Sequence, residues 1–336
     1  MTSNIGTITQ HPFIQPTTSK LTQKNHWDHI LARCAFNRMG HLVPPGLYAL
    51  GSPNPDTNVF VTANYTLSFD ALRQALDGLD AFILVLDTHG INVWCAAGKG
   101  TFGTDELVHR IEVTKLAEVV SHRRLILPQL GAPGVAAHDV KKRSGFKVEY
   151  GPVRAADIPE YLKTHQATPQ MRQVRFTLVD RLVLIPVEII NVLLPSLVAA
   201  VVVYFLAGLI PAIALAVAVF TGVVLFPILL PWLPTRYFSS KGLILGIVTA
   251  LPVAIAAIPG LLDAPWWKWV LNFPPLLMVF PALAAFIALN FTGSSTYTSK
   301  SGVKQEMFRF IPLMAWLAGI SLFLFLVSLG IWIIGA

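Results

Sequence analysis

The sequence predicts an α/β domain of Rossmann-like type followed by an all-α transmembrane domain of five helices. Hydrophobic residues make up 54% of the 336 residues and charged residues only 13%, which is too apolar for an ordinary soluble protein. The apolar excess lies almost wholly after Arg181, whereas the part before it alternates β-rich runs with helix-like segments. We therefore expect four regions: an N-terminal extension packing on the α/β domain (1–58), the α/β domain itself (59–165), a linker (166–181) and the transmembrane domain (182–336).

Strand and helix signals alternate from residue 59 to about residue 162. Strands are predicted at Val59–Thr62, Ala81–Asp87, Leu125–Pro128 and Lys147–Tyr150, and helices at Ser68–Leu76, from Thr104 onward and at Val135–Arg143. Ser68 is the expected N-cap of its helix. The alternation predicts a parallel sheet with helices on both faces. Residues 1–58 show weaker secondary-structure patterns. A single amphipathic helix is expected there, over residues 25–37.

Polar or Gly/Pro-rich turns follow the predicted strands, at residues 62–65, 87–90, 129–134 and 151–154. In parallel α/β folds, ligands bind beyond the carboxyl ends of the strands. Glycine and proline turns let the backbone approach a ligand closely. These turns therefore predict a site for a large, flat molecule.

Five apolar segments after Arg181 are each long enough to cross a bilayer, which takes about 20 helical residues. They are Val183–Ala207, Leu209–Leu233, Gly242–Leu262, Val270–Phe291 and Ile311–Gly335. Seven prolines at positions 195, 211, 227, 252, 259, 274 and 281 interrupt these spans, and kinks are expected there.

Basic residues lie on alternate sides of the predicted spans. They are Arg172, Arg175 and Arg181 before the first span, Arg236 and Lys241 between the second and third, and Lys300, Lys304 and Arg309 before the fifth, against Lys268 alone in the opposite loops. By the positive-inside rule, the chain is expected in the inner (cytoplasmic) membrane with the α/β domain in the cytoplasm and the C-terminus outside. No secretory signal peptide is expected, because the first third has no apolar core with a cleavage site.

Two polar features of the membrane half allow alternatives. Glu188 is either a group bonded between helices or at the interface, which we favour, or part of a transport relay. The hydroxyl-rich segment 290–303 either docks on the soluble domain or a cofactor tail, or is an ordinary turn. The net charge of +7 is explained by the membrane-flanking loops, and no nucleic-acid partner is expected.

Cys34 and Cys95 are the only two cysteines. A cytosolic domain keeps its thiols reduced, so both are expected to be free, with Cys34 structural. From the residues alone, Cys95 is either a small buried hydrophobe or a nucleophile paired with His89, His109 or His122. A zinc site is less favoured, since no Cys-x-x-Cys or His-x-x-x-His spacing lies nearby. Residues 96–98 are Ala, Ala and Gly, which would leave the thiol on a low-profile surface.

Residues 98–103 match the dinucleotide fingerprint G-x-G-x-x-G. That fingerprint also needs an acid at the end of the next strand to bind ribose. Here the next strand ends in Pro128 and Gln129. A Walker A loop fails as well, because Gly100 follows Lys99 where Ser or Thr is required. A nucleotide site is therefore not favoured.

The segment Asn92-Val93-Trp94-Cys95-Ala96-Ala97-Gly98-Lys99 resembles the cap-helix signature of the HgcA family, membrane-bound corrinoid proteins that methylate mercury. From residues 61–65 through 150–154 the chain is also similar to the corrinoid domain of the corrinoid iron-sulfur protein of acetyl-CoA synthesis. The resemblance implies a Rossmann-like corrinoid-binding domain with a cobalamin-type cofactor. It makes Cys95 the catalytic residue, whose thiolate is the lower axial ligand of cobalt.

The resemblance also implies the residues that contact the corrinoid. These are Thr62, Asn64, Tyr65, Asp87, Thr88, Asn92, Val93, Trp94, Cys95, Ala96, Ala97, Gly98, Lys99, Gly131, Ala132, Pro133, Gly151, Pro152 and Val153.

The resemblance implies transfer of a methyl group to Hg(II), either free or bound to thiols, to give methylmercury. A strongly donating thiolate favours release of the methyl with its electrons to a soft metal, which leaves cobalt needing reduction. A four-iron cluster takes four cysteines, so no iron-sulfur cluster is expected in this chain and an HgcB-like [4Fe-4S] ferredoxin is the expected reductant. A methyltetrahydrofolate-linked system is the expected methyl donor. Two rivals are a corrinoid methyl carrier of acetyl-CoA-type one-carbon metabolism, and a transporter or receptor with a regulatory α/β domain.

The predicted topology can be tested by cysteine labelling in intact cells. Cysteines introduced at Ser240 and Ser299 should react only with membrane-permeant reagents, because both lie in the basic loops. A cysteine at Ala264 should react with impermeant reagents. The reverse labelling pattern would place the α/β domain outside the cytoplasm.

Overall fold

The computed structural model describes residues 13–37, 39–259, 262, 264–295 and 299–335. The chain divides into two compact units that meet between Val174 and Arg175, within the expected linker. Each unit is described by itself.

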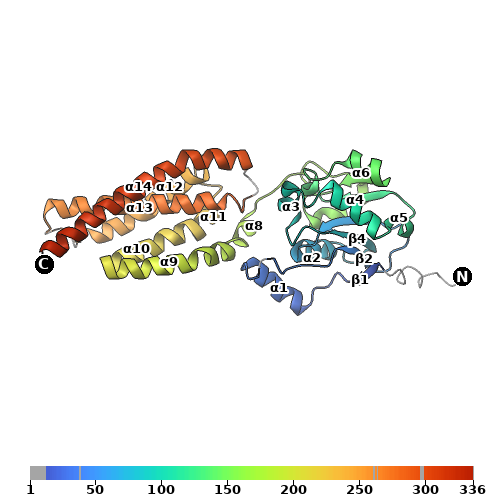
Figure 1. Cartoon of the computed structure of the whole chain (residues 1–336), viewed down its shortest axis with the longest axis horizontal. Helices are drawn as coiled ribbons and strands as arrows, with labels where there is room; N and C mark the ends of the chain where they lie inside the picture. Colours follow the sequence, from blue (N-terminus) through green and yellow to red (C-terminus); the bar gives the residue numbers. More distant parts are fainter. Residues whose placement is uncertain (1–12, 38, 260–261, 263, 296–298, 336) are drawn as a thin grey trace. The chain divides into compact units, whose positions relative to one another are not determined.

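The first unit is built on a six-stranded sheet of order β1-β2-β4-β3-β5-β6 (Figure 1). The strands are β1 (Ile14–Thr17), β2 (Gly46–Leu50), β3 (Val59–Ala63), β4 (Ala81–Leu86), β5 (Arg124–Leu127) and β6 (Lys147–Tyr150). Strands β3 to β6 run parallel, as expected, but β2 is antiparallel to β4 and carries β1 parallel to itself. The expectation of a wholly parallel sheet is therefore wrong for β1 and β2. The reason is the connection 51–58, which is shorter than the dozen or so residues of a parallel crossover.

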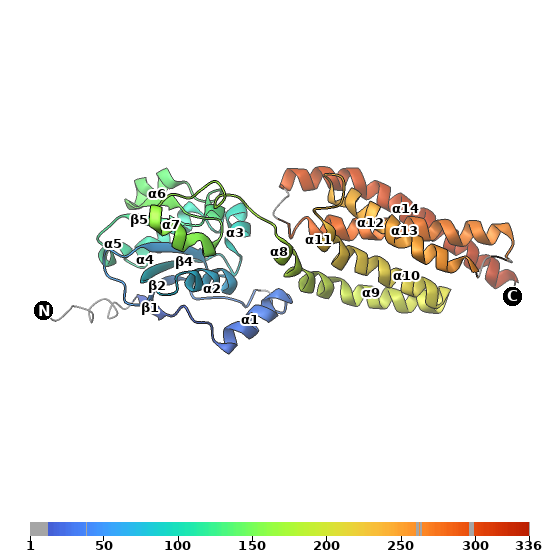
Figure 2. The same cartoon turned by 180° about the vertical axis from the view of Figure 1, so that it is seen from behind.

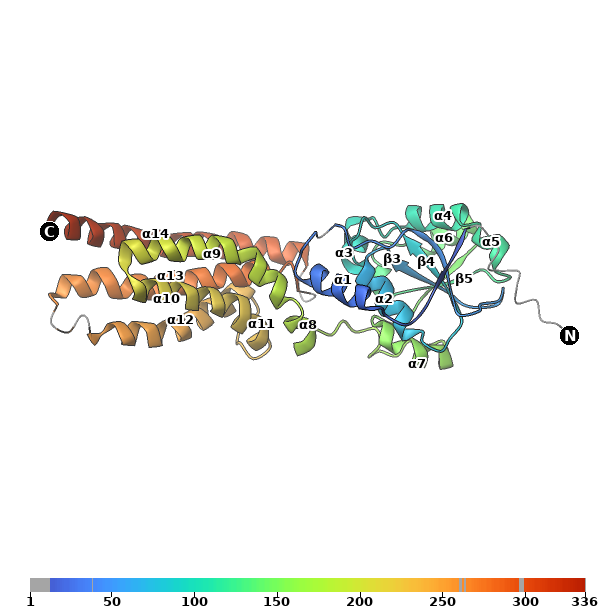
Figure 3. The ribbon, with the colours of Figure 1, turned by 90° about the horizontal axis from the view of Figure 1, so that it is seen from below.

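Helices cover both faces of this sheet, as predicted (Figure 3). Helices α3 (Val93–Lys99), α4 (Thr104–Val113), α5 (Leu116–Val119) and α6 (Ala137–Ser144) lie on one face, and α2 (Thr66–Ala75) and α7 (Ile158–Thr164) on the other. Helix α1 (Gln23–Arg33) adds no residue to either core.

Helix α2 begins earlier than the sequence indicates. Its N-cap is Tyr65, with no side-chain cap, so the expectation that Ser68 caps this helix is wrong. The amide of Thr66 instead donates to the carbonyl of His41 at 3.1 Å. A neighbouring segment thus satisfies a terminal amide that a capping side chain would otherwise bind.

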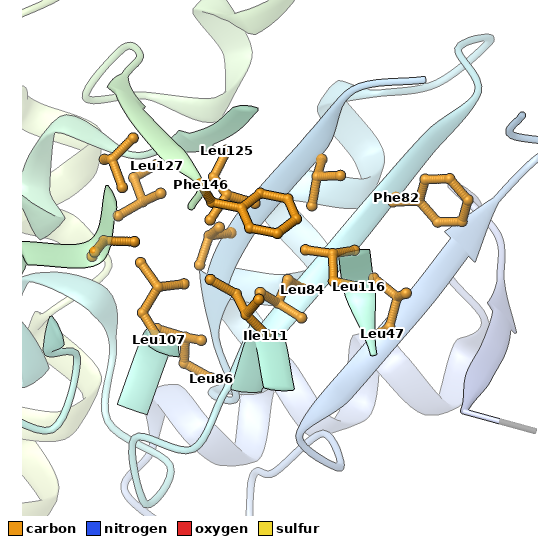
Figure 4. Packing of buried hydrophobic residues seen from close by; sticks show 14 of the residues in the cluster. Leu47, Phe82, Leu84, Leu86, Leu107, Ile111, Leu116, Leu125, Leu127 and Phe146 are labelled. Carbon is orange, nitrogen blue, oxygen red and sulfur yellow. The ribbon is translucent and has the colours of Figure 1, made fainter. Parts of the chain in front are cut away.

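The larger core lies between the sheet and helices α3 to α6. Leu84 and Leu86 of β4 pack there with Leu107 and Ile111 of α4, and Phe146 lies beside them with no exposed surface (Figure 4). Because β4 is buried on both faces, all six of its residues are apolar, which is why the sequence identifies it so clearly.

The second unit is all-helical (Figure 2). Its helices are α8 (Leu178–Leu182), α9 (Ile185–Ala207), α10 (Leu209–Phe220), α11 (Phe226–Leu229), α12 (Phe238–Ala257), α13 (Trp266–Phe291) and α14 (Lys300–Gly335), with a π-helical turn at Thr221–Leu225. Among the described residues, five stretches are long and apolar enough to cross a membrane, as predicted: Leu178–Ala207, Leu209–Leu229, Phe238–Ala257, Trp266–Phe291 and Ser301–Ile331. Helix α14 begins at Lys300, so its basic residues are helical and not in a loop.

Small residues bring α12 and α13 together. A Cβ on Gly242 would lie 2.7 Å from the Cα of Ala285, and one on Gly246 would lie 2.6 Å from the Cα of Pro281. Such close backbone approach is typical of membrane helices, where packing replaces the hydrophobic effect.

Glu188 of α9 is hydrogen-bonded to the turn that follows α13. Its Oε1 accepts a hydrogen bond from Ser294 Oγ at 2.7 Å. Ser294 belongs to the hydroxyl-rich segment, of which residues 296–298 lie outside the described residues.

Candidate functional site

The candidate site lies where the strand order reverses, between β3 and β5. Strand β4 adds to one side of β3, whereas β5 and β6 add to the other. Helix α3, which follows β4, packs on β3 and on the 3-10 turn Gln129–Gly131 that follows β5. Ligands of doubly wound folds bind at such a switch point, because the connections leave the sheet in opposite directions there.

A buried amide ties two strand ends together at this edge. Asn64 is 3% exposed. Its Oδ1 accepts hydrogen bonds from the Thr88 amide (3.0 Å), the Thr88 hydroxyl (2.8 Å) and the Gly90 amide (3.1 Å), and its Nδ2 donates to Asp87 Oδ1 at 3.1 Å. This network fixes the chain that leads from β4 into α3, since breaking it would leave the buried amides of Thr88 and Gly90 unpaired.

Helix α3 turns one face to the core and the other outward. Val93, Ala96 and Ala97 are buried, whereas Trp94 and Cys95 are half-buried. Asn92 caps the helix, because its Oδ1 accepts from the Cys95 amide at 2.9 Å. Cys95 is therefore set in the first turn of α3, on the face away from the core.

The open space beside Cys95 has a different origin from the one expected. Ala96 and Ala97 face the core and do not flank the thiol. Gly98 lies on the outward face, and a Cβ built on it would meet nothing within 4 Å. The low profile beside Cys95 therefore comes from Gly98 alone, which leaves open space one turn along from the thiol.

A glycine loop after β5 holds the far end of α3. A Cβ on Gly134 would lie 2.9 Å from the Cα of Ala97 and 2.1 Å from the carbonyl oxygen of Phe102, and one on Gly131 would lie 2.6 Å from the Phe102 ring. Burial raises the pKa of Tyr150, whose hydroxyl donates to the Val135 carbonyl at 2.5 Å and so ties the end of this loop to β6.

The G-x-G-x-x-G match ends a helix here and does not begin one. Gly100 is the left-handed C-cap of α3, and Gly103 precedes α4. A dinucleotide fingerprint must lie between a strand and the start of its helix. The glycines therefore serve the turn after α3, in agreement with the sequence argument against a nucleotide.

The structure disfavours His122 as a partner for Cys95. His122 lies just before β5 and bonds the Thr57 carbonyl at 2.9 Å, at the amino edge of the sheet, whereas α3 lies at the carboxyl edge. His89 is exposed beside Asp87, and His109 is exposed on α4. Among the described residues, no three His, Cys, Asp or Glu side chains form a cluster that could hold a metal ion.

The remaining predicted contacts surround the same edge. Thr62, Gly131, Gly151 and Pro152 are buried, Tyr65, Ala132 and Val153 are half-buried, and Lys99 and Pro133 are exposed. Val153 is held by its amide, which donates to the Met171 carbonyl at 2.8 Å. Cys95 is thus partly exposed and Lys99 exposed, whereas Thr62 is only 3% exposed.

The sequence missed one wall of the site. An open cleft of about 520 Å³ lies between the strand ends and residues 39–45; it is lined by Met39, Leu42, Val43, Pro44, Pro45, Asn64, Asp87 and His89. The Val43 amide donates to the Asn64 carbonyl at 2.9 Å, which draws this segment onto the edge of the sheet. The only sequence signal for this segment is Pro44-Pro45-Gly46. It indicates a loop, but it does not indicate that the loop lies against the ends of the strands.

Residues 37–162 match the family model of the CO dehydrogenase/acetyl-CoA synthase delta subunit. The gamma subunit of the acetyl-CoA decarbonylase/synthase complex from Archaeoglobus fulgidus is 35% identical over 123 residues, which are 36% of this chain and 26% of the relative. The gamma subunit from Methanopyrus kandleri is 32% identical over 123 residues, with the same coverage, and that from Methanocaldococcus jannaschii is 29% identical over 139 residues, 40% of this chain and 28% of the relative. The chain thus spans about a quarter of the length of these relatives, and the similarity lies in its α/β part.

Replacing Gly134 with alanine should destabilise the α/β domain. The new Cβ would clash with the backbone of Phe102 and Ala97, and overpacking of this kind costs about 1–3 kcal/mol. Fluorescence-detected thermal unfolding of the detergent-solubilised chain measures the loss. Gly98→Ala is the matched control, because it adds a Cβ in open space within a helix and should leave the transition unchanged or raise it. Equal unfolding of both variants would show that Gly134 does not set the position of α3.

Proposed function

We propose that the α/β domain binds a corrinoid and that the chain is a corrinoid-dependent methyltransferase acting on Hg(II), with Cys95 as the lower axial ligand of cobalt. The observation that carries the proposal is the position of Cys95, partly exposed on the outward face of a rigidly held helix at the switch point of the sheet. The similarity of residues 37–162 to acetyl-CoA decarbonylase/synthase subunits supports corrinoid methyl transfer as the class of reaction.

The residues present fit a corrinoid. The macrocycle is broad and flat, and open space lies over Gly98 beside the thiol. A thiolate is a soft donor that would suit cobalt, and the neighbouring Trp94 and Lys99 would supply an aromatic surface and a cation for the cofactor. The polar turns at residues 62–65, 129–134 and 151–154 lie at the same edge of the sheet.

The chain's own residues position the axial ligand. Asn92 fixes the first turn of α3, and the Asn64 network fixes the segment that enters it. Gly134 and Phe102 pack closely at the other end of α3. The backbone at Cys95 is therefore held in place when a ligand binds. A bound corrinoid would supply cobalt that carries a methyl group and releases it to an acceptor. The thiolate would increase electron density on the metal and so favour a soft electrophile.

The choice of Hg(II) as acceptor is supported by the segment Asn92–Lys99 and by its fusion to five apolar spans. A second candidate is a corrinoid methyl carrier of acetyl-CoA-type one-carbon metabolism. The similarity to acetyl-CoA decarbonylase/synthase gamma subunits favours it. We further propose the inner membrane as the location, the α/β domain in the cytoplasm, an HgcB-like ferredoxin as reductant and a methyltetrahydrofolate-linked donor.

Cys95→Ala should abolish methylmercury formation and change the visible absorption spectrum of the corrinoid-loaded protein. Loss of the thiolate removes the axial donor without disturbing the core face of α3. Cys34→Ala is the control, since Cys34 is the C-cap of α1 and is not among the residues of the proposed site, and it should change neither readout. Full methylmercury formation by Cys95→Ala together with an unchanged spectrum would exclude the axial role. A spectrum that changes in Cys95→Ala, with no methylmercury formed by the unmodified protein, would favour the methyl-carrier alternative.

The purified protein loaded with methylcobalamin should form about one methylmercury per corrinoid and then stop. The chain's two cysteines are fewer than the four that an iron-sulfur cluster requires, so electrons must come from another protein. Adding a reduced low-potential ferredoxin together with a methyl donor should restore turnover. Sustained turnover with the donor alone would contradict release of the methyl with its electron pair.

A further inference from the structure

Helix α1 packs on the α/β domain through polar side chains and turns its large apolar side chains outward. Trp27, Ile30 and Leu31 are 65%, 49% and 39% exposed, and no residue of α1 is buried. Their spacing of i, i+3 and i+4 places them on one face of the helix. Phe36, which is 66% exposed, comes just after the end of the helix. Its amide donates to the Leu31 carbonyl at 3.0 Å, which ties it to the last turn of α1. We name these four residues the α1 apolar surface.

Hydrogen bonds to a buried carboxylate fix this orientation. His29 Nε2 lies 2.7 Å from Oδ2 of Asp70, a residue of α2 that is 1% exposed. Asp70 is also paired with Arg73, which is 5% exposed and donates to the Lys20 carbonyl at 2.9 Å. Rotating α1 to bury its apolar face would leave Asp70 with one partner fewer, and unpairing a buried carboxylate is costly. The outward apolar surface is therefore built into the domain.

A second contact locks the end of the helix. Asp28 Oδ1 lies 2.7 Å from His41 Nδ1, and His41 Nε2 bonds the Phe36 carbonyl at 2.7 Å. Both Asp28 and His29, on the polar side of α1, thus contact the rest of the α/β domain. The cations Lys20, Lys24 and Arg33 remain exposed, so the outer side of this segment is apolar with a basic margin.

The linker between the α/β unit and the unit with the five apolar helices is short. Met171 is buried in the core of the α/β unit and Phe176 in that of the helical unit. The five residue steps between them span at most roughly 17 Å. An exposed apolar face with tryptophan and a basic margin is typical of a helix lying in the headgroup region of an anionic bilayer.

We propose that the α1 apolar surface inserts into the headgroup region of the bilayer that the five apolar helices span. Trp27, Ile30, Leu31 and Phe36 are the inserted side chains. Lys24 and Arg33 bind anionic lipid phosphates. Helix α1 is then a second membrane anchor for the α/β domain, independent of what the domain binds.

The test uses the full chain carrying Cys34→Ala and Cys95→Ala, reconstituted in phosphatidylcholine and phosphatidylglycerol vesicles. Ile30→Cys on α1 and Val113→Cys, an exposed apolar position (46%) at the end of α4, each carry one environment-sensitive fluorophore. Lipids with a nitroxide near the top of the acyl chain should quench the probe at position 30 several-fold more than the probe at position 113.

Equal quenching at the two positions would overturn the proposal. A blue-shifted but unquenched probe at position 30 would mean that a protein surface covers α1, which also overturns it. Lys24→Glu with Arg33→Glu should weaken quenching at position 30 in the anionic vesicles, and reversal of two exposed lysines on α6, Lys141→Glu with Lys142→Glu, should not. Unchanged quenching in the α1 double variant would exclude the lipid phosphate contact.

Discussion

The candidate site depends on the buried side chain of Asn64. Its carbonyl oxygen receives three hydrogen bonds from the segment that leaves β4, and its amide nitrogen donates a fourth to Asp87. An asparagine is one of the few side chains that can accept and donate at once in this way. Its loss would leave the amides of Thr88 and Gly90 without their partner inside the protein, and each buried unsatisfied group costs about 1–3 kcal/mol. Asn64 thus fixes the segment that leads into α3 and so contributes to the placement of Cys95.

The second constraint is steric. Helix α3 is short, and its position is set at its start by the Asn92 cap and at its end by the close approach of Gly134 to Ala97. Helices of this length are not stable alone, so the contacts around α3 determine its conformation. A thiol held this way can meet a large ligand without reorganisation of the backbone, which lowers the entropic cost of binding.

The same chain uses polar contacts where apolar packing would be expected. Helix α1 is held by His29 and Asp28 and exposes Trp27, Ile30 and Leu31. In the helical unit, Glu306 accepts hydrogen bonds from the amide (2.5 Å) and hydroxyl (2.8 Å) of Ser239, at the start of α12. Arg181 donates to the carbonyls of Pro227 and Ile228 at 2.7 and 2.6 Å, near the C-terminal end of the second apolar stretch, Leu209–Leu229. These ionic groups satisfy backbone atoms at helix ends, where the apolar residues around them offer no partner.

The sequence by itself determined the division into an α/β part and five apolar helices, because burial on both faces of a strand and the length of a span leave direct composition patterns. It also identified β3 to β6 and the unusual setting of Cys95. Only the tertiary structure decided the direction of β1 and β2, the inward position of Ala96 and Ala97, the Asn64 network and the cleft wall at residues 39–45. Hydrophobic periodicity reports whether a residue is buried, and it carries no information about which distant segment supplies the partner. Asn64, Gly134 and Leu42 act through such distant partners, so their roles became visible only in the folded chain.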